Sequence, residues 1–464
     1  MRFLEKAGLV GLGLVAGVSM SLHFAAQAEK EAAVAPLPIE ELRAFSEVFG
    51  RIKSDYVEPV TDKKLITEAI NGMLSGLDPH SAYLDAEAFK ELQVGTQGEF
   101  GGLGIEVGME DGLVKVISPI EDTPAYHAGI KSGDLIVKLD DTLVKGMTLN
   151  DAVKRMRGKP GSKIVLTIIR KDEPKPIIVT LTRAVIKVQS VKSKLIEPGF
   201  GFVRITQFQE HTGENLATAL ENLIKQNQGP LKGLVLDLRN DPGGLLTGAV
   251  GVSAAFLAKD ALVVYTEGRT EDAKMRLTAS PENYLRGDGK TDYLKRLPES
   301  IKTVPLVVLV NGGSASASEI VAGALQDHKR AVIMGTQTFG KGSVQTVLPL
   351  GNNTAIKLTT ARYYTPGGRS IQAKGIVPDI QVEDPSTSGM DKSFRLREAD
   401  LDKHLSNDRP AEEKPENAAK NQPATPANKG ESTKAAPTEF GTKNDYQLNQ
   451  ALNLLKGMQI LHGR

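Results

Sequence analysis

The spacing of hydrophobic residues changes along the chain and predicts several kinds of structure in succession. In residues 29–95 apolar residues recur every three or four positions, which predicts a helical N-terminal domain. In residues 97–183 they fall into short runs separated by glycine and polar residues, and these runs predict a small β-rich domain. Within that domain, Leu149–Arg157 has helical spacing instead.

Residues 186–382 alternate longer apolar runs with helical stretches, which predicts an α/β core. In the best strand candidates the apolar residues are consecutive, as in Leu234-Val235-Leu236, and this favours strands that are buried on both faces. The polar stretch Arg269–Ser300 interrupts the core and is expected to form a surface insertion. The expected fold class is therefore multidomain α/β.

The two ends of the chain have compositions of their own. Residues 1–28 combine a basic start, an apolar glycine-rich run and the pattern Ala26-Gln27-Ala28, which predicts a signal peptide or, if it is not cleaved, a membrane anchor. Residues 383–443 are rich in Pro, Ala, Lys, Asn and Glu, and this composition predicts a disordered linker. Residues 444–464 carry leucines at helical spacing and predict a short C-terminal helix.

Composition excludes several classes of function. Because 57 Lys and Arg balance 56 Asp and Glu, and because tryptophan is absent, no nucleic-acid partner is expected. The absence of cysteine excludes disulfides, thiolate nucleophiles and cysteine-ligated zinc. The 7 histidines form no pair at metal-ligand spacing, so neither a metal nor another cofactor is expected.

A serine-rich segment, Asn311–Ile320, follows the apolar run that ends at Val310 and precedes a helical stretch. Ser316 would then lie at a strand-to-helix turn, where its hydroxyl is exposed and free backbone N–H groups point outward, as a nucleophile requires. The same residues also fit a helix-capping box, because Glu319 follows Ser316 at the third position. From this segment alone both interpretations remain open.

Lys341 lies between two glycines after another apolar run. Burial by its neighbours would lower the pKa of its amine and allow it to act as a general base, whereas a solvated turn lysine is the alternative. A phosphate-binding loop is disfavoured, because Gly342 stands where that motif needs Ser or Thr and Ser343–Val347 has the pattern of a strand. Gly243–Gly244 follow a third apolar run and could offer N–H groups to an oxyanion or simply form a tight turn.

Together these segments resemble the carboxyl-terminal processing proteases, also called tail-specific proteases. The resemblance covers nearly the whole chain, and the family's S-A-S-A-S-E and F-G-K-G-x-V-Q patterns are matched without substitution at Ser314–Glu319 and Phe339–Gln345. The other matching segments are Leu77–Tyr83, Gly101–Ile105, Leu236–Gly244 and Tyr363–Gly368.

The resemblance implies a Ser/Lys serine protease that needs no histidine, cofactor or metal. It assigns the nucleophile to Ser316, the general base to Lys341 and the orientation of that lysine to Gln345. It places the oxyanion hole at the backbone N–H groups of Ala317 and of either Gly243 or Gly244. Ser314 and Ser318 are structural in this interpretation.

The resemblance also identifies residues 97–183 as a PDZ domain. Its glycine-rich loop, Gly101-Gly102-Leu103-Gly104-Ile105, would bind the C-terminal carboxylate of a peptide through backbone N–H groups while the peptide adds a strand beside it. Leu149–Arg157 would be the facing helix. The alternative is that these glycines only form a turn.

The expected function is a serine endopeptidase that cleaves exported polypeptides near free, apolar C-termini. It would act in the periplasm, or at the outer face of the inner membrane if residues 1–28 are not cleaved. By analogy with the family, the N-terminal helical region and the C-terminal helix are candidate elements of a homo-oligomer. The alternative from another class is a non-catalytic PDZ binding or chaperone protein, which a substituted Ser316 or Lys341 would have favoured.

Overall fold

The computed structural model describes residues 37–120, 122–171, 173–187, 189–286, 291–385, 397–409 and 440–462. The predicted signal or anchor segment 1–28 and most of the predicted linker 383–443 lie outside these residues. Contacts within the chain divide it into two units, residues 1–70 and residues 71–464.

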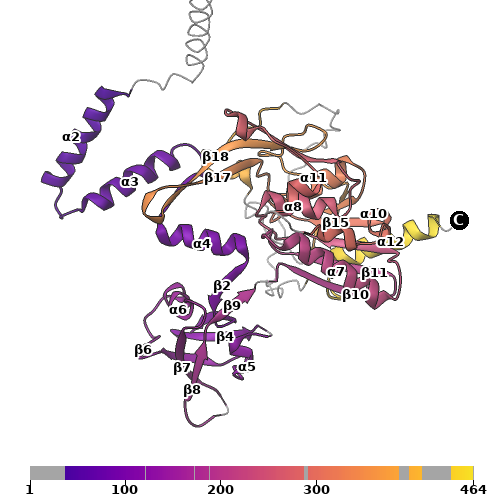
Figure 1. Cartoon of the computed structure of the whole chain (residues 1–464), viewed down its shortest axis with the longest axis horizontal. Helices are drawn as coiled ribbons and strands as arrows, with labels where there is room; N and C mark the ends of the chain where they lie inside the picture. The colour runs from indigo at the N-terminus through magenta and orange to yellow at the C-terminus, as the bar shows by residue number, and fades with distance from the viewer. Residues whose placement is uncertain are drawn as a thin grey trace, which may run out of the picture. The chain divides into compact units, whose positions relative to one another are not determined.

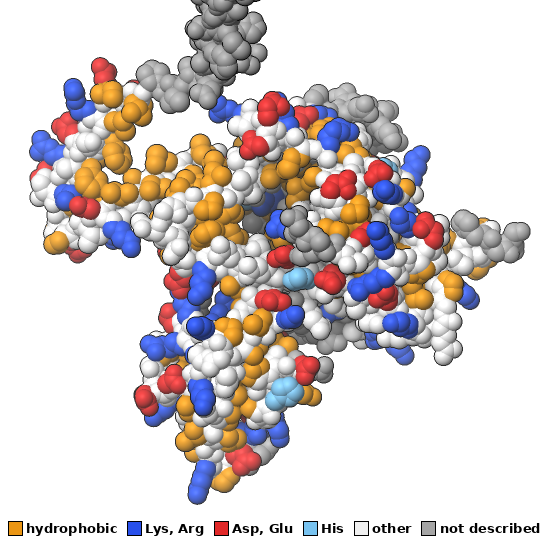
Figure 2. Space-filling model, viewed as in Figure 1, with side chains coloured by type: hydrophobic (Ala, Val, Ile, Leu, Met, Phe, Trp, Pro, Cys, Tyr) orange, Lys and Arg blue, Asp and Glu red, His pale blue; other side chains and the backbone are white. Residues whose placement is uncertain are grey.

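The first unit is helical, as its apolar spacing predicts. It contains α2 (Ile39–Asp55) and most of α3 (Asp62–Ser75). The apolar residues of α2 share one face, but none of them is buried, and Figure 2 shows apolar side chains at the surface of these helices. The exposed residues of that face are Leu42, Phe45, Val48 and Ile52.

The region predicted to be a PDZ domain is an antiparallel sheet in the order β3-β4-β5-β7-β8, with β6 beside β5 and a separate β2-β9 pair (Figure 1). Alternate residues of its strands, such as Val114 and Val116, are fully buried in a common core. The helix α4 (Ala86–Gln97) precedes this region. Its own elements are β2 (Glu99–Gly102), β3 (Ile105–Glu110), β4 (Leu113–Pro119), α5 (Pro124–His127), β5 (Leu135–Leu139), β6 (Thr142–Leu143), α6 (Leu149–Met156), β7 (Lys163–Ile169), β8 (Ile177–Thr182) and β9 (Ala184–Lys187).

The α/β core is built on a second sheet in the order β10-β11-β12-β15-β16-β19. Its strands run parallel from β11 to β19, and β10 is antiparallel to β11. Every residue of β12 and β15 is buried, which agrees with the consecutive apolar residues in their sequences. The strands are β10 (Val191–Glu197), β11 (Phe200–Ile205), β12 (Gly233–Asp237), β15 (Leu306–Val310), β16 (Val332–Gly335) and β19 (Ile380–Gln381).

Helices cover both faces of this sheet (Figure 1). On one face lie α7 (Thr212–Asn227), α8 (Leu246–Ala254) and α11 (Ala317–Asp327), and on the other lies α12 (Tyr446–His462). Leu448, Leu452 and Leu455 of α12 are buried in the same cluster as Val235 and Leu309 of the sheet. The sequence predicted this C-terminal helix but left open whether it docks on its own chain, and it does.

A third sheet, in the order β1-β18-β13-β14 with β17 beside β18, completes the core. Its strands are β1 (Ala82–Leu84), β13 (Leu262–Gly268), β14 (Arg276–Thr278), β17 (Ser343–Pro349) and β18 (Ala355–Tyr364). This sheet joins the Leu77–Tyr83 segment to β18, and β17 begins directly after Lys341 and Gly342. The loops that follow β12, β15 and β16 emerge at the carboxyl edge of the parallel sheet, where α/β proteins usually bind ligands.

Two stretches differ from what their composition predicts. Arg269–Ser300 was expected to be a surface insertion, yet Ala279 and Tyr284 belong to the main core and Tyr293 packs against it. A few apolar residues among many charged ones are enough to anchor the segment. In the predicted linker, residues 397–409 pack against the core, and Glu398 is fully buried.

Candidate active site

Ser316 lies in the turn between β15 and α11. Its backbone has a φ of +54°, in the left-handed region that residues with a side chain rarely adopt. The turn is held by the Ala315 N–H, which donates to the Asp241 carbonyl at 3.0 Å, and by the Ser316 N–H, which donates to the Glu319 carboxylate at 2.8 Å. The fold therefore holds a half-buried hydroxyl on a strained backbone, a combination that recurs at catalytic nucleophiles.

The serines on either side of Ser316 have structural partners. The Ser314 hydroxyl donates to the carbonyl of Leu238 at 2.8 Å, and the Ser318 hydroxyl donates to the carbonyl of Asp241 at 3.0 Å. Both serines are fully buried, so their bonds fix the turn against the loop that follows β12. Among these three serines, Ser316 alone keeps an exposed part of its surface.

Lys341 lies in the loop between β16 and β17 and is half-buried. Burial lowers the pKa of its amine, and the positive charge of Lys357 lowers it further. The carboxylates of Glu398, Glu319 and Asp78 oppose this decrease. The structure thus places Lys341 between the two alternatives that the sequence allowed, because its side chain is partly enclosed rather than fully solvated.

The carboxylate of Glu319 joins the Ser316 turn to the Lys341 loop. Glu319 is fully buried at the start of α11, and its Oε2 accepts the N–H groups of Ser316 at 2.8 Å and of Lys341 at 3.0 Å. Its Oε1 accepts the Gly340 N–H at 2.7 Å and the Thr338 hydroxyl at 2.5 Å. Burial raises the pKa of Glu319 to about 7, although the four donors favour the ionised form. The sequence predicted only the bond to Ser316, as half of a capping box.

Tyr363 of β18 makes a second connection between the two loops. Its hydroxyl donates to the carbonyl of Lys341, and its side chain interacts with that of Ser316. Burial raises the pKa of this hydroxyl well above its usual value, so Tyr363 is a neutral hydrogen-bond donor. The sequence signal for it was the Tyr363–Gly368 segment, to which no role was assigned.

Of the two candidate oxyanion-hole glycines, Gly243 lies against the nucleophile turn, whereas Gly244 lies against the backbone of Phe208. Gly243 has a φ of +94°, and a Cβ added there would lie 2.8 Å from both the Ala317 N and the Ser316 Cβ. Its own N–H donates to the Asp241 carboxylate at 2.8 Å. Gly244 forms a β-bridge with Phe208, but the hydrogen bonds of this bridge are made by the residues on either side of Gly244. Within the described residues, the Gly244 N–H itself makes no hydrogen bond. Of the two glycines, Gly244 is therefore the one with an available donor.

Gln345 is on β17, and its amide has partners other than the lysine. Its Nε2 donates to the Ser343 hydroxyl at 3.0 Å and to the Thr359 hydroxyl at 3.2 Å. Thr359 in turn donates to Asp78 at 3.1 Å. Among the hydrogen bonds of the described chain, none joins Gln345 to Lys341.

The glycine-rich loop of the β-rich region runs from β2 into β3. The Leu103 carbonyl accepts the Ala125 N–H at 3.0 Å, and the Gly104 carbonyl accepts the Ile120 N–H at 2.8 Å. The carbonyls are thus used within the domain, whereas β3 pairs with β4 on one side and forms the edge of its sheet on the other. An open strand edge beside a glycine-rich loop is the arrangement that peptide binding by strand addition requires.

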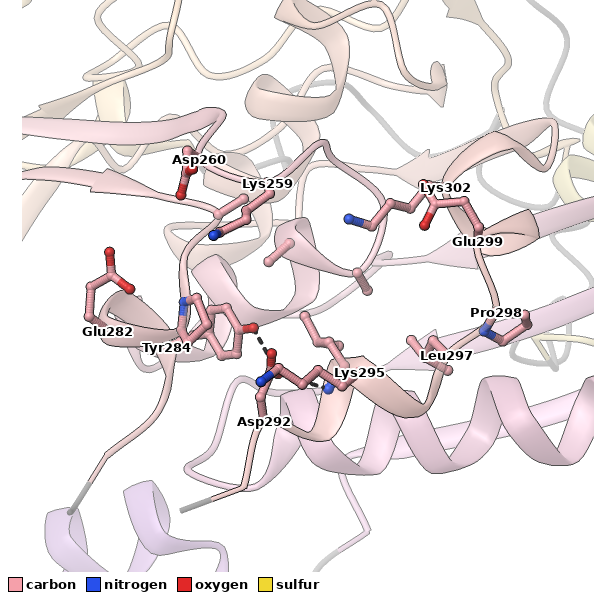
Figure 3. A pocket seen from close by; sticks show the side chains of 15 residues that line it. Lys259, Asp260, Glu282, Tyr284, Asp292, Lys295, Leu297, Pro298, Glu299 and Lys302 are labelled. Carbon is pink, nitrogen blue, oxygen red and sulfur yellow. Dashed lines mark hydrogen bonds between the residues drawn. The ribbon is translucent and has the colours of Figure 1, made fainter. Parts of the chain in front are cut away.

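A cavity of about 520 Å³ lies elsewhere on the α/β protease region (Figure 3). Its lining mixes lysines with carboxylates, and at its rim the Tyr284 hydroxyl donates to Asp292 at 2.9 Å. None of the site residues predicted from the sequence lines it. This cavity is separate from the Ser316 and Lys341 loops.

The described residues contain no group of three or more side chains that could together hold a metal ion. Within the same residues, no helix combines the length and the apolar character needed to cross a membrane.

Three family models match consecutive parts of the chain. Residues 199–382 match peptidase family S41, residues 101–181 match the PDZ domain, and residues 16–88 match the N-terminal domain of the activating protease CtpB. Together with the sheets described above, these matches confirm the predicted fold class of N-terminal helices, a PDZ domain and an α/β protease core.

Curated relatives extend over most of the chain. A carboxy-terminal-processing protease of Bartonella bacilliformis is 46% identical over 91% of this chain and 90% of its own length. The carboxy-terminal processing protease CtpB of Bacillus subtilis is 35% identical over 81% of this chain and 75% of its own length. Among solved structures, a photosystem II D1 C-terminal processing protease is 32% identical, with a TM-score of 0.40, over 77% of this chain and 91% of that one.

Proposed function

Because the chain belongs to the carboxy-terminal processing proteases of peptidase family S41, we propose that it cleaves exported polypeptides near their C-termini with Ser316 as nucleophile and Lys341 as general base. The observation that carries this proposal is the shared carboxylate of Glu319, which accepts the backbone N–H groups of both residues. A buried, multiply bonded link of this kind keeps nucleophile and base in fixed relative positions, as efficient proton transfer between them requires.

In the proposed reaction the neutral amine of Lys341 takes the proton of the Ser316 hydroxyl while Oγ attacks the scissile carbonyl carbon. The N–H groups of Ala317 and Gly244 stabilise the oxyanion. The C–N bond then breaks, and the protonated lysine gives its proton to the leaving amine. Lys341 next deprotonates a water molecule, which attacks the acyl carbon; the C–Oγ bond breaks, and the lysine gives the proton to Ser316 Oγ, which restores the free enzyme. Gln345 orients the lysine by accepting an N–H of its amine at Oε1, while Nε2 keeps its bonds to Ser343 and Thr359.

We assign recognition of the substrate C-terminus to the PDZ domain. The N–H groups of Gly101–Ile105 receive the carboxylate, and the peptide pairs with the free edge of β3. Ile105 and Val107 of β3 and Leu149 and Val153 of α6 are half-buried apolar residues on the same core. They support a preference for an apolar terminal side chain.

The site of action that we propose is the periplasm, or the outer face of the inner membrane. The support is the composition of residues 1–28, which lie outside the described part of the structure. N-terminal sequencing of protein from a periplasmic fraction tests this proposal. A mature N-terminus just after Ala28 supports cleavage and release, whereas an intact N-terminus in the membrane fraction supports an anchor.

The proteolytic mechanism is tested by incubating the purified protein with an unfolded polypeptide and mapping new termini by mass spectrometry. We expect cuts near the C-terminus by the wild type, none by Ser316→Ala or Lys341→Ala, and substantial activity in the control Ser314→Ala. The same cuts made by Ser316→Ala at the wild-type rate would refute the assignment of the nucleophile. A wild-type protein that binds the polypeptide without cutting it would instead point to a non-catalytic PDZ protein.

A further inference from the structure

A short segment of the predicted linker, residues 397–409, packs against the loop that carries Lys341. The Glu398 N–H donates to the Phe339 carbonyl at 3.2 Å, and the Arg397 guanidinium donates to the Lys374 carbonyl at 2.9 Å. Further along, the Asn407 amide donates to the Gln372 carbonyl at 2.7 Å. The chain thus returns from a stretch of linker-like composition to make contacts at the catalytic centre.

Glu398 is the buried anchor of this segment. Its carboxylate lies 2.8 Å and 3.0 Å from Nε2 of His80, and it accepts the Gln372 amide at 2.9 Å. The other end of the Gln372 amide accepts the N–H of Gly342 at 3.0 Å. A continuous chain of hydrogen bonds therefore runs from His80 through Glu398 and Gln372 to the residue that follows Lys341.

The charge of Glu398 also acts on Lys341. Burial alone would raise the pKa of Glu398, but the hydrogen bonds with His80 and Gln372 hold it below the usual value. Glu398 is therefore ionised at neutral pH. The charged groups that act on the Lys341 amine are Lys357 of β18, Glu319 of α11, Asp78 before β1, and Glu398.

Stability alone does not account for a buried, ionised carboxylate at this place. Removing such a charge from water costs several kcal/mol, and well-packed apolar residues usually stabilise a core as well or better. The charge is placed where the proposed mechanism needs an amine of controlled basicity in a fixed position. A contribution to catalysis would then explain why a charge that costs folding stability is present at this position.

We propose that Glu398 is a positioning residue for Lys341, which holds the general-base loop through Gln372 and Phe339 and adds a negative charge to the surroundings of the amine. His80 completes the arrangement by fixing the Glu398 carboxylate. This inference rests on the proposed role of Lys341 as general base.

The test compares Glu398→Gln with Asp400→Asn in the full-length protein. Asp400 lies on the same segment and loses the same charge in its variant, but it is exposed, and among the described residues its carboxylate accepts only the N–H of Arg397. For Glu398→Gln we expect kcat on a short peptide to fall about tenfold, because the loop loses a charge-assisted bond, with KM unchanged. The rising limb of the pH–rate profile should move to lower pH by about half a unit, because the lysine loses a neighbouring negative charge. Asp400→Asn should leave both quantities unchanged.

A second pair of variants covers the outcome that Glu398→Gln does not fold, which circular dichroism would reveal. His80→Gln keeps a donor for the Glu398 carboxylate and should retain most of kcat, whereas His80→Phe removes the donor and should lose about tenfold. Equal kcat in the two His80 variants, or a Glu398→Gln protein with wild-type kcat and pH profile, would overturn the inference. Activity in Lys341→Ala would instead overturn the proposed function, so the two failures are distinguishable.

Discussion

Two glycine-rich regions of this molecule, the active-site loops and the PDZ loop, use backbone N–H groups in contrasting ways. In the active site the N–H groups of Ser316, Gly340 and Lys341 surround a carboxylate that belongs to the chain itself, that of Glu319. In the PDZ domain, according to our proposal, the N–H groups of Gly101–Ile105 receive the carboxylate of another polypeptide.

The contrast shows what each loop contributes. The Glu319 carboxylate is always present, so the geometry around it is fixed before a substrate arrives, and fixed geometry lowers the entropic cost of the chemical step. The proposed substrate carboxylate would have to be bound in every turnover, which would allow the PDZ loop to discriminate between chain ends. In our proposal the fixed donors serve catalysis, and the exchangeable donors serve selection of the substrate.

The largest expected effect comes from removing the internal carboxylate. Glu319→Ala leaves four donors without an acceptor, so we expect kcat to fall about 100-fold or more and the free energy of unfolding to fall by about 3 kcal/mol. Glu319→Gln keeps the shape of the side chain, but its amide NH2 group then faces other donors. The decreases in kcat and in the free energy of unfolding should therefore be smaller than for Glu319→Ala. Peptide cleavage and urea unfolding measure both effects, with the exposed Glu271→Ala as control. A wild-type kcat in Glu319→Ala would show that the internal carboxylate is not needed to hold the catalytic loops.

A smaller effect is expected from removing the external carboxylate. Amidation of the C-terminus of an unfolded substrate should lower kcat/KM about tenfold, since a charge-assisted interaction is lost. Amidation of a short peptide that reaches Ser316 without binding to the PDZ domain should leave its kcat/KM unchanged. Val153→Asp should weaken binding of the same substrate, because it places a charge on the apolar face of α6. Ile178→Asp, at an exposed position of β8, is the matched control. Equal cleavage of free and amidated substrates would remove the carboxylate-binding role from the PDZ loop.

The smallest effect concerns a second internal carboxylate, Asp241, whose Oδ1 accepts the Gly243 N–H and whose Oδ2 has no hydrogen-bond partner among the described residues. Burial raises its pKa to about 7 from a usual value of 3.8. Between these values the folded chain keeps a proton that the unfolded chain has released, so stability falls as pH rises. Glu319, with a pKa of about 7, acts in the same direction.

We therefore expect the thermal midpoint of the wild type to decrease when the pH is raised from 6 to 7. Asp241→Asn should remove about 1 kcal/mol of that loss, because the asparagine does not titrate. Thermal melts of both proteins at the two pH values measure the difference. An identical pH dependence in wild type and variant would show that Asp241 is ionised in the folded protein throughout this range.

Local pattern was enough to predict much of the fold and the position of the loops. Consecutive apolar residues such as Leu234–Leu236 identified the buried strands, and the residues after them identified the Ser316 and Lys341 turns. The spacing of Leu448, Leu452 and Leu455 identified the C-terminal helix. Each of these signals lies within one element and the loop next to it.

The contacts that assemble the site were beyond such patterns. The capping motif predicted the bond of Glu319 to Ser316, but Gly340 and Lys341 are more than twenty residues away from it in sequence. Tyr363 lay in a segment that matched the family, but no role could be assigned to it, because its bridging position depends on the pairing of β18. Glu398 was hidden by the linker-like composition around it, because its partners His80 and Gln372 are far from it in sequence or lie in another element.

The central claim is that Lys341 activates Ser316, and labelling with a fluorophosphonate probe followed by peptide mapping tests it most directly. The account predicts a single label on Ser316 in the wild type, none in Ser316→Ala, and labelling at least about 100-fold slower in Lys341→Ala, because the hydroxyl then lacks its general base. Labelling of Ser314 or Ser318, or a wild-type rate in Lys341→Ala, would contradict it.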